Sequence, residues 1–213
     1  MKIIRDQGLR IGTDHKVRCF WPDDKKDYIL YHDKEWGTPL ADDNLLFEKI
    51  CLEGFQSGLS WLTVLRKRTN LRKAFLNFNF EKLSGFNNKD VESLMKNKGI
   101  IRHRKKIEST INNARRASEL SIEFGSLARF FWQYEATPEE RPKRLTFKTF
   151  KTLTNSKKST RLAKDLKQRG WTYVGPVTMY SFMQSIGMVN DHIEGCFCRE
   201  LTEEKRKNFK RPK

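Results

Sequence analysis

Glu53 is the residue whose position most suggests chemistry, because it lies in the apolar run of residues 50–55. Removing an ionised carboxylate from water costs several kcal/mol unless a partner compensates, and otherwise its pKa rises. Trp61 follows eight residues later, across a tight turn that holds Gly58 and Leu59, and it could close a pocket over the carboxylate. The alternative is that Glu53 caps a neighbouring helix or pairs with one of the many lysines and arginines.

An aromatic-rich segment precedes this run. Tyr28 and Tyr31 are three residues apart, so on a short helix they would share a face. Aromatic rings stack on flat heterocycles, and a carboxylate accepts hydrogen bonds from an exocyclic amine. The set could therefore form a pocket for an electron-poor or cationic base, although an ordinary aromatic core is the alternative. The aromatic members are Trp21, Tyr28, Tyr31, Trp36 and Trp61.

Cysteines and histidines near the two ends of the chain form a second constellation. His192 and Cys196 are four residues apart, and on one face of a predicted helix both could reach the same ion. With Cys19 and His32 they would make a closed tetrahedral zinc site, which is structural because catalytic zinc keeps a position for water. The spacing is not that of a zinc finger, so separate core thiols and surface histidines are the alternative. Further candidates are Cys198 and His15.

A helix, a short turn and a second helix are predicted around residues 170–175. Residues 156–169 form an amphipathic pattern closed by Gly170, and the apolar stretch 177–186 follows Gly175. Backbone N–H groups and the positive dipole end at the start of the second helix would suit a phosphate. Thr172 and Gly175 are therefore candidate nucleic-acid contacts. An ordinary interhelical turn explains the glycines equally well.

The overall charge favours a polyanionic partner. The 213 residues carry 43 lysines and arginines against 26 acidic residues, a net charge of +17, and each phosphate that is neutralised releases counterions. No segment approaches 18 uncharged apolar residues, and the N-terminus lacks the apolar core of a signal peptide. We expect a protein of the cytoplasm that contacts no membrane, in which the four cysteines form no disulfides.

Helical periodicity accounts for most of the chain, and no stretch alternates like a strand, so the predicted fold class is all-α. Residues 1–14 are expected to be a flexible arm, residues 135–152 a loop and residues 201–213 a basic, disordered tail. One domain is predicted between them, over residues 15–200. The predicted helices are 44–56, 60–76, 89–98, 102–124, 126–134, 156–169, 177–186 and 190–201.

These motifs together resemble the DNA-3-methyladenine glycosylase I family, over roughly residues 18–198. The resemblance implies a helix-hairpin-helix DNA glycosylase fold, with the hairpin at about residues 170–175, and a structural zinc site that joins the N- and C-terminal segments. It implies hydrolytic excision of 3-methyladenine from alkylated double-stranded DNA, leaving an abasic site. The segments that carry it are 28–37, 46–61, 99–104, 173–175, 180–184 and 189–192.

The resemblance also implies roles for particular residues. Glu53 matches the carboxylate that reads the base and is the candidate catalytic residue, Trp61 matches the stacking plate, and Leu59 with Gly58 matches a turn that enters the gap left by a flipped nucleotide. Further pocket residues are Tyr28, Tyr31 and Trp21, further DNA contacts are Thr172 and Gly175, and the zinc ligands are Cys19, His32, His192 and Cys196.

Residues 176–178, just beyond the hairpin, contain no lysine, so we expect a monofunctional enzyme without strand-cutting lyase activity. We assign no catalytic role to Asp191, which could simply support its neighbour His192. A monomer is expected. The competing hypotheses are a non-catalytic DNA-binding module, which would have no reason to keep a carboxylate facing aromatic rings, and a zinc hydrolase, which four protein ligands disfavour.

Overall fold

The structure, a computed structural model, describes residues 2–213 and is mostly helical, as the sequence predicts. Its α-helices are α1 (Lys26–Lys34), α2 (Asp43–Gln56), α3 (Trp61–Ala74), α4 (Phe80–Leu83), α5 (Asn88–Lys96), α6 (Arg104–Phe124), α7 (Leu127–Trp132), α8 (Phe147–Thr152), α9 (Lys157–Gln168), α10 (Pro176–Ser185) and α11 (Cys198–Asn208). Short 3-10 helices are η1 (Arg5–Gln7), η2 (Leu76–Phe78) and η3 (Pro138–Glu140).

Polar caps fix the ends of the helices that carry the site. The Asp42 carboxylate accepts a hydrogen bond from the Leu45 N–H at 2.9 Å and starts α2. The Ser60 hydroxyl accepts one from the Thr63 N–H at 3.2 Å and starts α3. Side chains of this kind satisfy backbone donors that have no partner within the helix. The two caps therefore fix where α2 and α3 begin, and Ser60 starts α3 directly after the short turn that follows α2.

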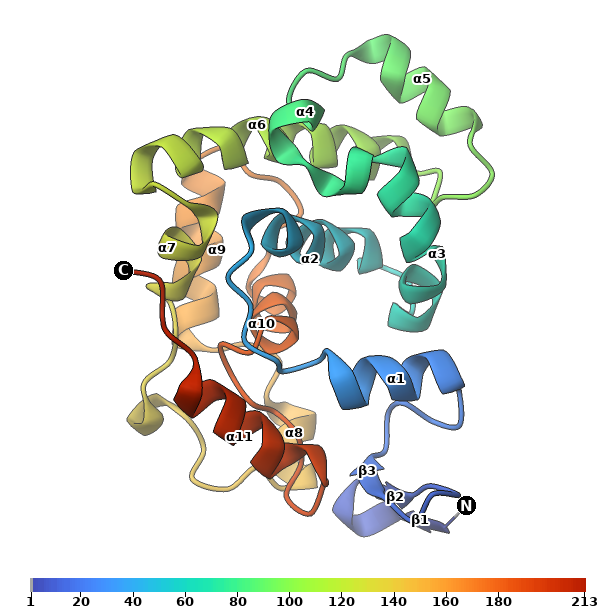
Figure 1. Ribbon diagram of the computed structural model, residues 1–213, viewed down its shortest axis with the longest axis vertical. Helices are drawn as coiled ribbons and strands as arrows, with labels where there is room; N and C mark the ends of the chain where they lie inside the picture. The colour runs from blue at the N-terminus through green and yellow to red at the C-terminus, as the bar shows by residue number, and fades with distance from the viewer. Residues whose placement is uncertain (1) are drawn as a thin grey trace.

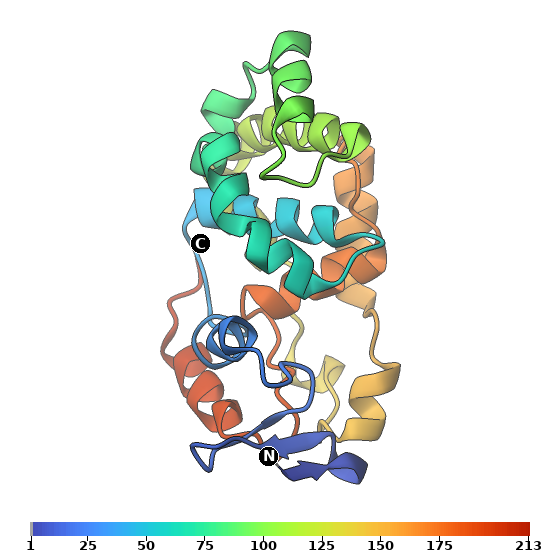
Figure 2. The same cartoon turned by 90° about the vertical axis from the view of Figure 1, so that its right-hand side faces the viewer.

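Helix α2 is the centre of the larger of two hydrophobic clusters. It packs against α3, α6, α7 and α10, and its residues 46–55 are all buried. In Figure 1 these helices occupy the upper and middle parts of the molecule, while α1, α8, α11 and the strands lie below them; Figure 2 shows the same division after a quarter turn. The second cluster lies in that lower part, around Leu9, Cys19, Ile193, Cys196 and Cys198.

The N-terminal segment is a small sheet, so the prediction of a flexible arm over residues 1–14 is wrong for the residues described; Met1 lies outside them. Strands β1 (Lys2–Ile4), β2 (Leu9–Ile11) and β3 (Val17–Cys19) pair antiparallel in that order. Leu9 is buried against Cys19 and Ile193. Three-residue strands are too short to produce a readable alternation, which explains why the sequence pattern missed them.

The C-terminal segment is also ordered, contrary to the predicted disordered tail. Helix α11 continues to Asn208, Arg206 is 8% exposed, and both Arg206 and Arg211 donate to the Glu135 carboxylate at 2.9 Å. The Phe209 ring packs on Trp132 with centroids 4.5 Å apart. Basic residues thus hold this segment against α7 by ion pairs and ring contacts, which composition alone does not show.

Two local predictions also fail. The helix predicted over residues 190–201 begins only at Cys198, because the Asn190 side chain accepts from the His192 N–H at 3.2 Å and Gly195 has φ +87. The predicted loop 135–152 contains η3 and α8. Within residues 2–213, no helix combines the length and apolar character needed to cross a membrane.

Candidate active site

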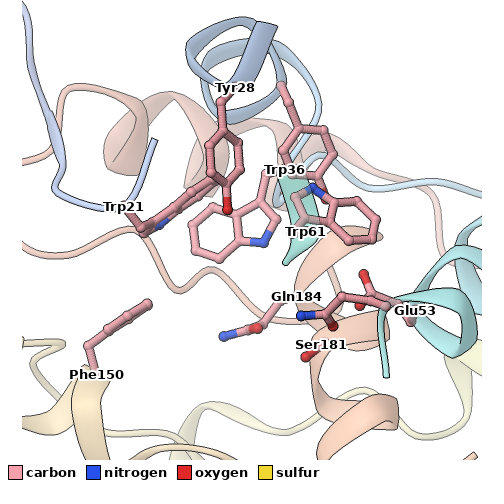
Figure 3. Close-up of a pocket in the computed structure, with 10 residues that line it drawn as sticks. Trp21, Tyr28, Trp36, Glu53, Trp61, Phe150, Ser181 and Gln184 are labelled. Atoms are coloured by element: carbon pink, nitrogen blue, oxygen red, sulfur yellow. The ribbon is translucent and has the colours of Figure 1, made fainter. Parts of the chain in front are cut away.

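A cavity of about 290 Å³ lies where α1, α2, α3, α8 and α10 meet. In Figure 3 the rings of Tyr28, Trp36 and Trp61 stand on one side of it, and Gln184 and Ser181 lie on the other. The cavity is lined by Trp21, Tyr28, Tyr31, Trp36, Glu53, Gln56, Trp61, Phe150, Ser181 and Gln184. The structure thus brings together all six residues that the sequence analysis placed at the pocket, Glu53 and the five aromatic residues.

Glu53 is 4% exposed and lies in the third turn of α2. Burial raises the pKa of its carboxyl group to about 8, although the positive charge of Lys49 acts in the opposite direction. Its carboxylate has no hydrogen-bond partner among residues 2–213, whereas the Lys49 ammonium is bound to Glu35 and lies 5.0 Å from the centre of the Tyr31 ring. Glu53 is therefore neither a helix cap nor half of an ion pair, which were the structural alternatives.

The aromatic side chains support one another around the cavity. Ring centroids are 4.9 Å apart for Trp21 and Tyr28, 5.0 Å for Trp21 and Trp36, and 5.3 Å for Tyr31 and Trp61. Tilted and edge-on contacts of this kind are favourable for aromatic rings and keep their faces in place. Burial, together with the Glu53 charge, raises the pKa of Tyr28 to about 12, so its phenol keeps its proton.

Sequence reasoning missed four residues of the cavity, Gln56, Phe150, Ser181 and Gln184. Ser181 and Gln184 are three apart on α10, and two polar side chains on one face of an apolar helix are a signal that could have found them. Phe150 could not have been found, because its helix α8 lies in the segment predicted as a loop. Its ring contacts Phe20 with centroids 5.9 Å apart, beside the N-terminal sheet.

The turn between α2 and α3 projects Leu59 from the surface. Leu59 is 39% exposed, and Gly58 has φ +77, a conformation that favours glycine. Lys106 of α6 braces the turn, because its ammonium donates to the carbonyl oxygens of Phe55 at 2.7 Å and Ser57 at 2.5 Å. The turn is thus a fixed apolar tip next to the residues that line the cavity.

Helices α9 and α10 pack against each other and are joined by the turn 169–175, in which Gly170 has φ +81. Asn113 of α6 holds this turn: its amide donates to the Thr172 carbonyl and accepts from the Thr172 N–H, both at 3.0 Å. The Thr172 hydroxyl is itself bonded to Ser109 at 2.6 Å. Gly175 is the N-cap of α10 and bears no side chain, which leaves backbone donors at the start of that helix accessible.

The four predicted metal ligands converge in the lower cluster, and Cys198 joins them. Cys19, His32 and Cys196 have ligand atoms within 4.8 Å of one another, as do His32, His192 and Cys198. All of these residues are buried, and imidazole with thiolate is the donor set typical of zinc. His15, the other spare candidate, is exposed and belongs to neither group. His192 and Cys196 reach the cluster from an irregular segment and not from one helix face.

The histidines are oriented as metal ligands usually are. His192 has its Nδ1 bonded to the Asn190 side chain at 2.9 Å, while its buried Nε2 has no hydrogen-bond partner in the part of the chain that the structure describes. His32 has Nδ1 2.8 Å from an Asp33 oxygen and Nε2 3.6 Å from the Cys196 sulfur. Ligand histidines commonly hold their second nitrogen on an oxygen in this way, and an orphaned buried nitrogen is otherwise costly. The residues present therefore fit a zinc ion.

Residues 21–199 match the family model described as methyladenine glycosylase. The chain belongs to the methyladenine glycosylase family. Glu53, the aromatic cavity, the α9–α10 turn and most of the cysteine and histidine cluster lie inside the matched range, whereas Cys19 and the N-terminal sheet precede it.

Individual relatives agree with the family match. The chain is 44% identical over 181 residues to DNA-3-methyladenine glycosylase 1 of Escherichia coli strain K12, covering 85% of this chain and 96% of that one. A crystal structure of a 3-methyladenine DNA glycosylase I has a TM-score of 0.79 at 45% identity, over 85% of this chain and 99% of the other. A tyrosine-to-phenylalanine variant of such an enzyme, in complex with 3-methyladenine, has a TM-score of 0.77 at 34% identity, over 82% and 93%.

Proposed function

We propose that this protein is a DNA repair glycosylase that flips 3-methyladenine out of alkylated double-stranded DNA and hydrolyses the bond between base and sugar, leaving an abasic site. One observation carries the proposal: the buried Glu53 carboxylate, without a hydrogen-bond partner among residues 2–213, faces a cavity walled by aromatic rings. Family membership and a related enzyme in complex with 3-methyladenine support it.

The substrate explains why the cavity needs no strong acid. Methylation at the ring leaves the adenine cationic within DNA, so the bond to the sugar is already weak. The bond breaks with its electron pair moving to the base, which departs neutral, and a water molecule adds to the sugar carbon and loses a proton. A cation between Trp61 and Glu53 interacts favourably with both the ring and the carboxylate. Normal adenine, being neutral, gains neither interaction to the same extent.

Two exposed features would position the DNA. Leu59 would enter the space vacated by the flipped nucleotide, because it is an apolar tip on a braced turn. The backbone donors at the start of α10, next to Gly175, would bind a phosphate of the same strand. Thr172 would contribute indirectly, by holding the turn in place, since Ser109 engages its hydroxyl and Asn113 engages its backbone N–H and carbonyl. Extruding a nucleotide costs a few kcal/mol, which these contacts would offset.

A structural zinc ion would be held by Cys19, His32, His192 and Cys196, and it would supply a cross-link between the chain ends, not chemistry at the base. The absence of strand cutting is supported by the cavity lining, which contains no lysine that could form a Schiff base with the sugar. The protein would act as a monomer.

The direct test compares base release from methylated DNA by the wild-type protein and by Glu53→Gln. The amide keeps the shape of the side chain but cannot become an anion, so we expect release of 3-methyladenine to fall by about two orders of magnitude or more. The matched control is Glu92→Gln, on the distant helix α5, where the carboxylate pairs with Arg104 in solvent. This control should release the base at the wild-type rate.

Absence of 3-methyladenine release by the wild-type protein would refute the proposed activity and would favour a DNA-binding module without catalysis. Equal release by the wild type and Glu53→Gln would refute the role of Glu53 alone. Cleavage of the strand during release, in the absence of added base or amine, would contradict the monofunctional assignment. A borohydride trap of the protein on DNA detects the lyase intermediate directly.

A further inference from the structure

Asp191 is a buried carboxylate that accepts hydrogen bonds from three side chains. It is 1% exposed, and its Oδ2 accepts from the Tyr180 hydroxyl at 2.6 Å and from Gln184 Nε2 at 2.8 Å. Its other oxygen accepts from Arg141 at 3.1 Å. Burial and the Asp191 charge raise the pKa of Tyr180, so the phenol keeps its proton and donates. The carboxylate therefore acts as an acceptor on both of its oxygens.

This arrangement fixes the orientation of the Gln184 amide. A carboxylate beside a guanidinium cannot donate, so only the NH₂ end of Gln184 can face Asp191. Turning the amide over would set its carbonyl oxygen against the Asp191 Oδ2 with no proton between the two oxygens, which is strongly unfavourable in a buried site. Gln184 Oε1 must therefore point away from Asp191, and among residues 2–213 it accepts no hydrogen bond.

Gln184 also lines the cavity that holds Glu53. Its backbone is held as well, because its carbonyl oxygen accepts from the Gly37 N–H at 3.1 Å. Figure 3 shows Gln184 across the cavity from Trp36 and Tyr28, on the same side as Ser181. The cavity thus presents two acceptors from different helices, the Glu53 carboxylate from α2 and the Gln184 carbonyl from α10.

We propose that Gln184 is a specificity-determining residue that accepts a hydrogen bond from the exocyclic amine of the flipped base, and that Asp191 is a positioning residue that acts through it. The inference rests on the proposed glycosylase function. An amine at ring position 6 has two N–H bonds to donate, whereas a 6-oxo purine presents an acceptor there. When a 6-oxo base enters, its oxygen at position 6 faces the fixed Gln184 carbonyl oxygen with no proton between them. The 6-oxo base is therefore rejected.

DNA treated with a methylating agent carries both 3-methyladenine and 3-methylguanine, so one digest gives the ratio of their release rates. We expect Gln184→Met, which keeps the length of the side chain without the acceptor, to lower the ratio of 3-methyladenine to 3-methylguanine release about tenfold. Gln133→Met makes the same substitution at an exposed position of the α7 C-terminus and should leave the ratio unchanged. General damage to the fold would slow both reactions together and leave the ratio intact.

The role of Asp191 is tested in a double-mutant cycle. Asp191→Asn allows the Gln184 amide to turn over, so this substitution should also lower the ratio of 3-methyladenine to 3-methylguanine release. Added to Gln184→Met, the same substitution should lower the ratio no further. Bound metal is measured for each variant, because His192 is adjacent. An unchanged ratio in Gln184→Met would overturn the specificity role, and a further fall in the double variant would overturn the positioning role.

A measurement on the unaltered protein guards against a variant that does not fold. The Gln184 side-chain amide protons should exchange with solvent at least tenfold more slowly than those of the exposed Gln133, since one of them is donated to a buried carboxylate. Equal exchange rates would overturn the positioning role of Asp191. If the wild-type protein releases neither base, the proposed glycosylase function itself fails. If the wild type is active and Gln184→Met has the same release ratio, only the role of Gln184 fails.

Discussion

In the proposed function, Glu53 would stabilise a bound cation at the expense of the stability of the fold. A carboxylate buried without a partner has its pKa raised to about 8, so near neutral pH it holds a proton that it would lose in the unfolded chain. When a cationic base enters, the ionised form becomes favoured and the proton is released. Such a group is expected where function outweighs stability, and its location on the rigid helix α2 keeps it aimed at the cavity.

The raised pKa predicts the pH dependence of stability. An acid whose pKa is higher in the folded state keeps its proton there while the unfolded state loses it, so stability falls as pH rises between the two values. Relative to Glu53→Gln, the free energy of unfolding of the wild type should be constant below about pH 4.5, fall through the range up to pH 8, and level off above it. The total decrease should be on the order of 5 kcal/mol. Denaturant titrations at several pH values measure this difference.

Glu92→Gln, on the surface, provides the comparison for that experiment, since it removes only the carboxylate of an exposed ion pair with Arg104. The free energy of unfolding of the wild type relative to Glu53→Gln could instead stay constant from pH 4.5 to 8. That result would show that the Glu53 carboxyl group is ionised in the free protein, and the account of its burial would be wrong.

Some site residues can be predicted from the sequence because they are close in it or share a helix face. Glu53 and Trp61 are separated by one turn, and Tyr28 and Tyr31 lie on α1 as their spacing predicts. Gln184 and Asp191 are different. Gln184 reaches the cavity only because α10 packs on α2, and Asp191 reaches Gln184 only because the chain turns back after Gly187. No local pattern encodes those contacts.

At the scale of elements, the end of α10 depends on Gly187. This residue has φ +74, and a Cβ atom there would lie 2.5 Å from the Pro39 nitrogen and 2.6 Å from the Gly37 carbonyl oxygen. Both are backbone atoms that cannot rotate away. We expect Gly187→Ala to destabilise the protein by about 3 kcal/mol, from a strained backbone and a displaced 37–39 segment, and to lower the melting temperature by roughly 6–12 °C.

Gly85→Ala is the matched control for this substitution. Gly85 is exposed, and a Cβ there would meet the Lys82 carbonyl oxygen at an ordinary 3.6 Å. Its melting temperature should remain within about 2 °C of the wild type. If Gly187→Ala melted like Gly85→Ala, the close approach of α10 to residues 37–39 would not exist in solution.

The cysteine and histidine cluster predicts a metal-dependent stability. The purified protein should contain one zinc per chain by mass spectrometry, and a strong chelator should lower its melting temperature by about 10 °C, since several kcal/mol of binding energy contribute to the fold. His192→Ala should melt at the lower temperature and be indifferent to the chelator. His15→Ala, at an exposed histidine outside the cluster, should behave like the wild type.

The elements that the sequence did not predict share one physical property: long-range contacts stabilise them. The helices α2, α3, α6 and α9 have apolar residues at helical spacing and side-chain caps, and α10 is an apolar run that begins with Pro176. Their existence and approximate bounds therefore follow from local sequence. The strands β1, β2 and β3 are each three residues long, and they form where Leu9 meets Ile193. Helix α11 and the residues after it are held by Glu135 and Trp132.

At the scale of the whole molecule, the net charge of +17 predicts how binding responds to salt. If about six phosphates are contacted, affinity for duplex DNA should fall roughly a thousandfold between 50 and 200 mM monovalent salt. Leu59→Ala should weaken binding at every salt concentration without changing the slope, because it removes an apolar contact and no charge. Fluorescence anisotropy with a labelled duplex measures both effects, and binding indifferent to salt would rule out a phosphate interface.

The joining of the chain ends has a consequence for synthesis on the ribosome. The Ile193 N–H donates to the Cys19 sulfur at 3.3 Å, a contact between residues 174 positions apart. Helix α1, which carries Tyr28 and Tyr31, therefore completes its contacts only after almost the whole chain has been translated, and such distant contacts form slowly. A nascent or prematurely terminated chain would have the α2 carboxylate without the finished aromatic wall opposite it. Incomplete copies would thus lack a base pocket altogether, and an unfinished enzyme could not remove bases from DNA.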